Sequence, residues 1–202
     1  MQEQEVIKIL KKDLNFSEFS IDKLKSFCNQ LILANQKHNF ISKNTESNVW
    51  HRHILDSAQL VKFIDFKKGS LADLGSGAGL PGIVLAIFNR NKDFHVKLYE
   101  KSPVKRIFLK KIVENLNLNV KILSNIIDEE IFSETIVCRA FKKLEKVIQV
   151  SREIAKKPHK LIVLKGQNAQ EEVNSAFKNN KYPYKLEKSM TNNDSKIFIA
   201  DF

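Results

Sequence analysis

The stretch LADLGSGAGLPG, residues 71–82, determines the fold that the sequence predicts. It overlaps a short apolar run, SLADL at 70–74, that is typical of a buried strand and leads directly into glycines. Glycines let the backbone turn tightly and let a ligand approach without a Cβ in the way. Pro81 suits the first turn of a following helix, where its missing N–H costs nothing. This order of strand, loop and helix predicts an α/β sheet with a ligand beyond the carboxyl end of the strand.

Strands and helices alternate along the rest of the chain. Further strands are expected at 95–100, 120–125, 136–140 and 161–166, with helices near 82–89, 104–117, 143–156 and 169–180. Such alternation predicts a parallel sheet covered on both faces. Two last strands, at 184–189 and 196–202, are joined by residues 190–194 and look like a hairpin. A mostly parallel, seven-stranded, Rossmann-like sheet with a C-terminal antiparallel hairpin is the layout of the class I S-adenosylmethionine methyltransferase fold.

Residues 1–68 form a helical extension in this interpretation, and residues 69–202 form the Rossmann-like core. Apolar residues recur at helical spacing between Ile21 and Ile32, after a candidate cap at Ser20. A polar connection at 39–47 separates this helix from a second amphipathic stretch at 49–66.

The glycine pattern alone leaves two cofactors open. Residues 77–82 also satisfy GxGxxG, the dinucleotide fingerprint of a nicotinamide-dependent oxidoreductase. Asp73 favours S-adenosylmethionine, because a carboxylate two residues before the first glycine can face an ammonium group but would serve a pyrophosphate poorly. Glu100, at the end of the second strand, can accept hydrogen bonds from ribose hydroxyls in either case. The candidate cofactor contacts are Asp73, Gly75, Gly77, Gly79 and Glu100.

The charge balance favours a polyanionic partner. The chain has 34 basic and 23 acidic residues, a net charge of +11. Because 29 of the basic residues are Lys, a biased nucleotide composition of the genome is the competing explanation for the positive charge. A cluster of basic residues lies on the helix expected after the second strand. It can be interpreted either as a solvated helix face or as a face that binds phosphates. Its members are Lys101, Lys105, Arg106, Lys110 and Lys111, and Val104, Ile107, Phe108 and Ile112 are expected to form the buried stripe of the same helix.

Three further charged residues lie near the expected sheet edge. Arg139, in CRAF, ends the fourth strand, where packing does not explain a charge, and Lys165 follows the fifth strand at the equivalent position. In WHRHILDS, residues 50–57, Arg52 and Asp56 are four apart and can pair on one helix face, either as a simple ion pair or as a clamp on a ligand.

No metal site and no membrane span are expected. His51 and His53 point in different directions on a helix, and Cys28 and Cys138 lie far apart, which fits a reducing cytosol. No segment approaches about 18 consecutive apolar residues.

Several separated motifs together resemble the RsmG family, also called GidB, of bacterial 16S ribosomal RNA (guanine-N7) methyltransferases. The motifs are RHILDS at 52–57, DLGSGAGLPGIVLAI at 73–87, KRIFLKKIVENLNL at 105–118, CRAF at 138–141 and LKGQ at 164–167. The chain departs from the family at Cys138, where Ser is usual, at Val84, where Pro is frequent, and in a shortened stretch at 125–135.

The resemblance implies methyl transfer from S-adenosylmethionine to guanine N7 in 16S rRNA, free or within the small ribosomal subunit, by a cytoplasmic protein expected to be a monomer. By residue matching, it adds cofactor contacts at Gly75, Leu80, Ile126, Ile127 and Arg139. The RNA-binding candidates are Arg52, Lys105, Arg106, Arg139 and Lys165.

Methylation of guanine N7 requires no general base, because N7 carries a lone pair and no proton. Proximity and alignment can then supply about 7–11 kcal/mol, and no catalytic acid or base is predicted. In A-form RNA the N7 edge faces a groove that side chains cannot enter, so the target guanine must be unpaired or unstacked. A methyltransferase for a small molecule or a protein, and a non-catalytic RNA-binding protein, remain as alternatives.

Overall fold

The computed structural model of the protein describes residues 1–67, 69–126, 131–178 and 182–202. In these ranges the chain forms the predicted seven-stranded sheet, in the order β3-β2-β1-β4-β5-β7-β6. The strands are β1 (Ser70–Leu74), β2 (His95–Tyr99), β3 (Val120–Leu123), β4 (Thr135–Arg139), β5 (Lys160–Lys165), β6 (Tyr184–Lys188) and β7 (Lys196–Asp201).

Strands β1 to β5 pair in parallel, whereas β7 runs antiparallel to both β5 and β6. The predicted mostly parallel sheet with a terminal hairpin is therefore confirmed. The strand order reverses between β1 and β4, where the connections on either side leave in opposite directions. In open α/β sheets a ligand binds at such a switch point, beyond the carboxyl ends of the strands.

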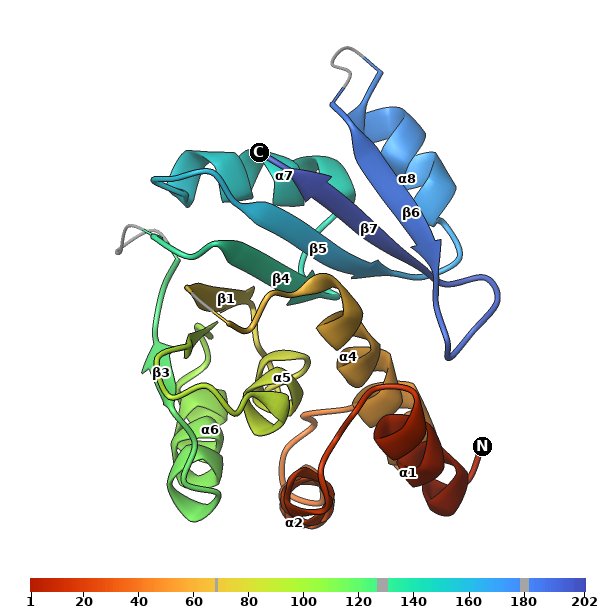
Figure 1. The fold of residues 1–202 in the computed structure, drawn as a ribbon, viewed down its shortest axis with the longest axis vertical. Helices are drawn as coiled ribbons and strands as arrows, with labels where there is room; N and C mark the ends of the chain where they lie inside the picture. The colour runs from red at the N-terminus through yellow and green to blue at the C-terminus, as the bar shows by residue number, and fades with distance from the viewer. Residues whose placement is uncertain (68, 127–130, 179–181) are drawn as a thin grey trace.

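Two helical layers cover the sheet (Figure 1). The helices of the core are α5 (Gly82–Phe88), α6 (Pro103–Asn115), α7 (Leu144–Ile154) and α8 (Ala169–Ala176). Successive strand residues alternate between two apolar clusters, because side chains on a strand point to opposite faces. Val137 and Ile162 pack toward α5, α6 and the N-terminal helices, while Ile136 and Leu161 pack toward α7 and α8. Both faces of the sheet are therefore buried over the central parallel strands, as a parallel sheet requires.

The N-terminal extension packs on the α5 face through α2 and α4 (Figure 1). Its elements are α1 (Glu3–Lys12), α2 (Glu18–Asn35), α3 (Lys43–Glu46), the π-helix η1 (Trp50–Leu55), α4 (Asp56–Ala58) and the 3₁₀-helix η2 (Gln59–Phe63). The extension shares one apolar cluster with the sheet, to which Leu24 and Leu31 contribute. The domain boundary expected between residues 68 and 69 stays a prediction.

Three local predictions need correction. The cap of α2 is Ser17, whose hydroxyl accepts from the Ser20 N–H at 3.1 Å, so the predicted cap at Ser20 is wrong by one turn. The polar connection at 39–47 contains the short helix α3. On α6 the buried residues are Phe108, Leu109 and Ile112. The predicted stripe was wrong for Val104 and Ile107, which are 46% and 69% exposed.

No helix in the described ranges has the length and apolar character needed to span a membrane.

Candidate active site

The glycine loop follows β1 at the carboxyl edge of the sheet. Gly75, Gly77 and Gly79 have φ angles of +72°, +57° and +89°, a region that costs other residues about 1–2 kcal/mol each. The N–H groups of Gly75 and Ser76 both donate to the Tyr99 carbonyl, at 2.9 and 3.0 Å, and this anchors the loop to the end of β2. Local backbone conformation therefore explains why glycines occupy these three positions.

Asp73 lies fully buried beneath this loop. Its Oδ2 accepts from the Gly82 N–H at 3.0 Å, at the start of α5, while its Oδ1 is buried with no hydrogen-bond partner in the described structure. Burial raises the pKa of Asp73 from its ordinary value of 3.8 to about 7, although the hydrogen bond from Gly82 opposes this. A Cβ added at Gly82 would lie 2.6 Å from the Asp73 carboxylate, so glycine is needed there for close packing. An orphaned carboxylate oxygen beside a glycine loop has unused capacity to interact with a cation.

Glu100 is fixed directly after β2 by the same loop. One carboxylate oxygen accepts from the Gly77 N–H and the other from the Ser102 N–H, each at 2.8 Å. Each oxygen keeps a lone pair, so Glu100 can still accept from hydroxyl groups of a ligand. Arg106 stabilises this turn, because its Nη1 donates to the carbonyls of Glu100 and Lys101 at 3.0 and 2.6 Å.

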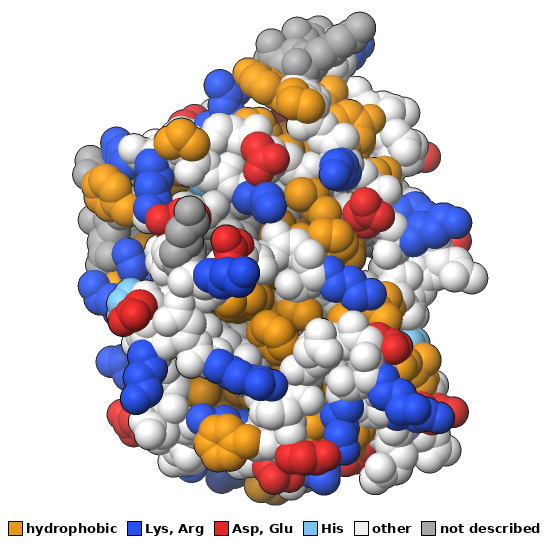
Figure 2. Space-filling view, in the orientation of Figure 1, with side chains coloured by type: hydrophobic (Ala, Val, Ile, Leu, Met, Phe, Trp, Pro, Cys, Tyr) orange, Lys and Arg blue, Asp and Glu red, His pale blue; other side chains and the backbone are white. Residues whose placement is uncertain are grey.

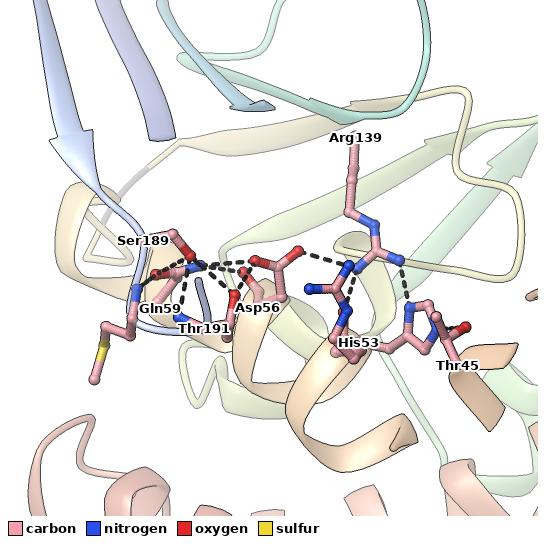
Figure 3. Close-up of polar contacts among 9 residues, drawn as sticks. Thr45, His53, Asp56, Gln59, Arg139, Ser189 and Thr191 are labelled. Atoms are coloured by element: carbon pink, nitrogen blue, oxygen red, sulfur yellow. Dashed lines mark hydrogen bonds and ion pairs between the residues drawn. The ribbon is translucent and has the colours of Figure 1, made fainter. Parts of the chain in front are cut away.

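Arg139 ends β4 and reaches into the N-terminal extension (Figure 3). Its guanidinium donates to the Asp56 carboxylate at 3.2 Å, to the Arg52 carbonyl at 3.3 Å and to Nδ1 of His53. The His53 Nε2 lies 2.8 Å from the Thr45 hydroxyl, which itself donates to a backbone carbonyl. Hydrogen bonding thus assigns the proton of His53 to Nε2. Burial, followed by repulsion from Arg139 and Arg52, lowers its pKa to about 4 and keeps the ring neutral.

The other side of this network reaches the β6–β7 hairpin (Figure 3). Asp56 Oδ1 accepts from Thr191 at 2.9 Å and from Gln59 at 3.0 Å. Gln59 also contacts Ser189 and accepts from the Met190 N–H at 2.8 Å. One carboxylate therefore connects the extension, β4 and the terminal hairpin.

A cavity of about 340 Å³ opens beside Arg139, between the carboxyl ends of β4 and β5 and the π-helix. Its lining residues are Thr45, Arg52, His53, Asp56, Arg139, Ala140, Leu164, Lys165, Gly166, Glu172, Thr191 and Ser195. Its volume lies at the lower end of the range of about 300–1,000 Å³ found for small-ligand pockets. The segment after β4 borders both this cavity and the glycine loop, because Ala140 lines the cavity and the ring of the next residue, Phe141, lies against Gly75.

The sequence of the chain matches the family model described as "GidB: rRNA small subunit methyltransferase G" over residues 20–197. The chain belongs to the GidB family. Among the GidB relatives, "Ribosomal RNA small subunit methyltransferase G" of Pelagibacter ubique is 35% identical over 192 residues, which cover 92% of this chain and 90% of the relative. The protein of the same name from Rickettsia rickettsii is 39% identical over 178 residues, covering 88% and 91%.

Solved structures share the GidB chain's fold at low sequence identity. A putative S-adenosylmethionine-dependent methyltransferase from Methanococcus maripaludis has a TM-score of 0.56 at 15% identity, covering 73% of this chain and 84% of its own. TYW2 from M. jannaschii, solved in complex with AdoMet, has a TM-score of 0.53 at 19% identity, covering 74% of each chain. The fold is therefore that of S-adenosylmethionine-dependent methyltransferases, as the sequence predicts.

The structure brings most of the predicted cofactor residues of the GidB chain to one sheet edge. Asp73, the three loop glycines and Glu100 lie together at the ends of β1 and β2, whereas Arg139 lies across the switch point on β4. Leu80 and Ile126 are each 6% exposed. Ile127 lies outside the described residues.

The predicted RNA-binding residues divide into two groups. Arg52, Arg139 and Lys165 line one cavity, while Lys105 and Arg106 lie on α6. Asp56 pairs with Arg139 instead of Arg52, so the expected pairing of Arg52 with Asp56 was wrong. Among the described residues, no group of three or more His, Cys, Asp and Glu side chains could hold a metal ion.

Two residues that shape the site were not predicted from the sequence. Phe141 lies against Gly75, and Glu172 pairs with Lys165 at 2.7 Å. Phe141 is part of the CRAF motif and could have been singled out there. Glu172 gives no such signal, because its role depends on α8 folding back beside β5.

Proposed function

We propose that this chain transfers a methyl group from S-adenosylmethionine to guanine N7 of 16S rRNA in the small ribosomal subunit. Membership of the GidB family, together with relatives named as small-subunit rRNA methyltransferases, carries this proposal. Since the substrate would be ribosomal RNA, the protein would act in the cytoplasm, and we propose that it acts there as a monomer.

The glycine loop and its neighbours fit S-adenosylmethionine. The buried Asp73 oxygen without a partner offers negative charge toward an ammonium or sulfonium group, and ionisation of Asp73 would be favoured by a cation nearby. Positive φ at the loop glycines leaves no Cβ to block the approach of a ligand. Glu100, already oriented by Gly77 and Ser102, would accept from ribose hydroxyls. A pyrophosphate would meet two carboxylates here, which argues against a dinucleotide.

The chemistry needs little from acid–base residues. S-adenosylmethionine, when bound, supplies a methyl group on positively charged sulfur, and guanine N7 has the lone pair to accept it without a general base. The neutral His53 and the ion-paired Arg139 and Asp56 therefore serve to hold the site in shape. Orientation of the two substrates supplies most of the rate.

The net positive charge provides the attraction for RNA. The net charge of +11 is spread, and on the face drawn in Figure 2 the Lys and Arg side chains are interspersed with Asp and Glu. Lys105 lies in the first turn of α6, which follows Glu100 in the chain, and the exposed Arg52 lines the cavity beside Arg139. Phosphates of an unpaired RNA segment would lie along these side chains.

Transfer of labelled methyl groups tests the proposal. The protein would be incubated with methyl-labelled S-adenosylmethionine and, separately, small ribosomal subunits lacking the modification, naked 16S rRNA, cell proteins or a metabolite extract. We expect label in 7-methylguanosine from 16S rRNA in one of the first two reactions. Label in proteins or metabolites alone would replace the proposal with the alternative of a different methyl acceptor.

A further inference from the structure

Lys165 and Glu172 form an ion pair on the wall of the cavity beside Arg139. The Lys165 ammonium donates to Glu172 Oε2 at 2.7 Å and to the Lys142 carbonyl at 2.8 Å. The same Oε2 accepts from the Leu144 N–H, at the start of α7, at 2.6 Å. Burial alone would raise the pKa of Glu172, but the hydrogen bonds from Lys165 and Leu144 outweigh it and lower the pKa. Glu172 is therefore an ionised acceptor in a fixed position.

The pair keeps hydrogen-bonding capacity that the described structure does not use. An ammonium group has three donors, and two of those on Lys165 are engaged. Glu172 Oε1 accepts no hydrogen bond from the described residues, whereas Oε2 accepts two. Gly166, between the two elements that carry the pair, would have open space around an added Cβ. One donor and one acceptor therefore stand side by side at the wall of a cavity.

The other charged groups of the cavity are already engaged or lie at its surface. Asp56 accepts from Arg139, Gln59 and Thr191, and Arg139 donates to three groups of the extension. The Arg52 side chain is exposed and forms no ion pair with any residue that the structure describes. A ligand would thus meet a donor–acceptor pair within the cavity and a free guanidinium at its edge.

We infer that this cavity holds the target guanine of the RNA and that the Lys165–Glu172 pair reads its Watson–Crick edge. The inference rests on the proposed function. Lys165 donates to O6, Glu172 Oε1 accepts from N1–H, and Arg52 contacts a neighbouring phosphate. Enzymes that act on a single base read it in this way after taking it out of its stack. N7 stays free of the pair, and the segment after β4 borders both sites, because Ala140 lines the cavity and Phe141 lies against Gly75 of the glycine loop, where the methyl donor is proposed to lie.

The substitution Glu172→Gln separates this role from a structural one. The amide oxygen of Gln can still accept from Leu144 and Lys165 in the position of Oε2. The amide NH₂ then takes the position of Oε1, so a donor replaces the free acceptor. We expect methyl transfer to small subunits to fall at least about 10-fold, while the protein stays folded and its affinity for S-adenosylhomocysteine stays unchanged. The matched control is Glu171→Gln, an exposed neighbour on α8 with the same change of charge, which is expected to behave as the wild type.

A base analogue provides a second test, whose main comparison uses the wild-type protein alone. Small subunits would be reconstituted with 16S rRNA carrying inosine or O6-methylguanine at the methylated position. Inosine keeps O6 and N1–H, whereas O6-methylguanine has no proton on N1. We expect wild-type protein to methylate inosine and to discriminate against O6-methylguanine at least about 10-fold, and Glu172→Gln to narrow that difference.

The outcomes are distinct. Equal methylation of both analogues by the wild type, or an unchanged rate in Glu172→Gln, would overturn the inference and leave the proposed function intact. Weaker S-adenosylhomocysteine binding in Glu172→Gln would also overturn it, because the pair would then serve the cofactor. A wild-type protein that methylates no guanine in small-subunit RNA would remove the proposed function itself.

Discussion

Replacing Asp73 by Asn is expected to stabilise the free protein at pH 8 while weakening cofactor binding. The pKa of Asp73 rises from 3.8 to about 7 because the side chain is fully buried, so the folded state holds the proton more tightly than the unfolded state. Asp73 therefore has no effect on the free energy of unfolding below about pH 3.8, where it is protonated in both states. It lowers the free energy of unfolding as the pH rises from about 3.8 to about 7. At about 1.36 kcal/mol per pH unit, ionised Asp73 costs the folded state about 4 kcal/mol at pH 8.

The amide of Asn removes this cost and introduces a smaller one. Its oxygen can accept from Gly82 as Asp73 Oδ2 does, but its NH₂ would replace the orphaned Oδ1 and remain unpaired, which costs about 1–3 kcal/mol. The net gain at pH 8 is then about 1–3 kcal/mol. At pH 4 Asp73 is protonated in the folded state and its burial costs little, so the unpaired amide leaves the variant less stable than the wild type by up to about 3 kcal/mol.

Urea unfolding of Asp73→Asn and the wild type at pH 4 and pH 8 measures both differences. Calorimetry at pH 8 with S-adenosylhomocysteine, which keeps the ammonium group, measures the cost to binding, expected to be about 10-fold for loss of a charged partner. A variant that is less stable than the wild type at pH 8, or that gains the same stability at both pH values, would refute this account of Asp73.

Three other substitutions test the site. Gly75→Ala should lower the free energy of unfolding by at least about 1–2 kcal/mol, because Gly75 has a positive φ. Gly166→Ala, where an added Cβ meets open space, should leave urea unfolding unchanged. Equal effects of the two substitutions would contradict the explanation by positive φ. Asp56→Ala should lower the free energy of unfolding by about 1–3 kcal/mol, since it leaves the guanidinium on β4 without its carboxylate, and unchanged urea curves would show that the ion pair contributes nothing. Lys105→Glu should weaken RNA binding and reduce its dependence on salt by about one counterion, without changing the affinity for S-adenosylhomocysteine. Lys8→Glu, on α1, should have little effect on RNA binding. Equal losses of RNA affinity in filter binding would indicate that net charge alone attracts the RNA.

The sheet could be predicted from local sequence patterns, because strands and turns depend mainly on residues that are neighbours in the chain. The strand at 70–74, the glycine loop and the terminal hairpin all follow from short apolar runs and turn residues, and the structure has them at nearly the expected positions. The predicted buried stripe of α6 was partly wrong, because periodicity alone could not decide which of its apolar residues face the sheet. Ile107 lies on the solvent side, and Leu109, which was not assigned to the stripe, is fully buried.

The polar network around Arg139 could not be predicted in the same way. It joins Arg139 to Asp56 across 83 positions and Asp56 to Thr191 across 135 positions. Sequence spacing suggested a pair between Arg52 and Asp56 because both lie on one helix, yet the tertiary fold brings a better-placed guanidinium to the same carboxylate. Contacts of this kind depend on how β4, the extension and the hairpin meet, which no local pattern contains.

Calorimetric titration with S-adenosylhomocysteine tests the central claim most directly, because the glycine loop, Asp73 and Glu100 are argued to form the pocket for a methyl donor. We predict one molecule bound per wild-type chain, markedly weaker binding to Gly75→Ala, and no heat with NADH. Heat with NADH, or none with S-adenosylhomocysteine under conditions in which the protein is folded, would contradict the account.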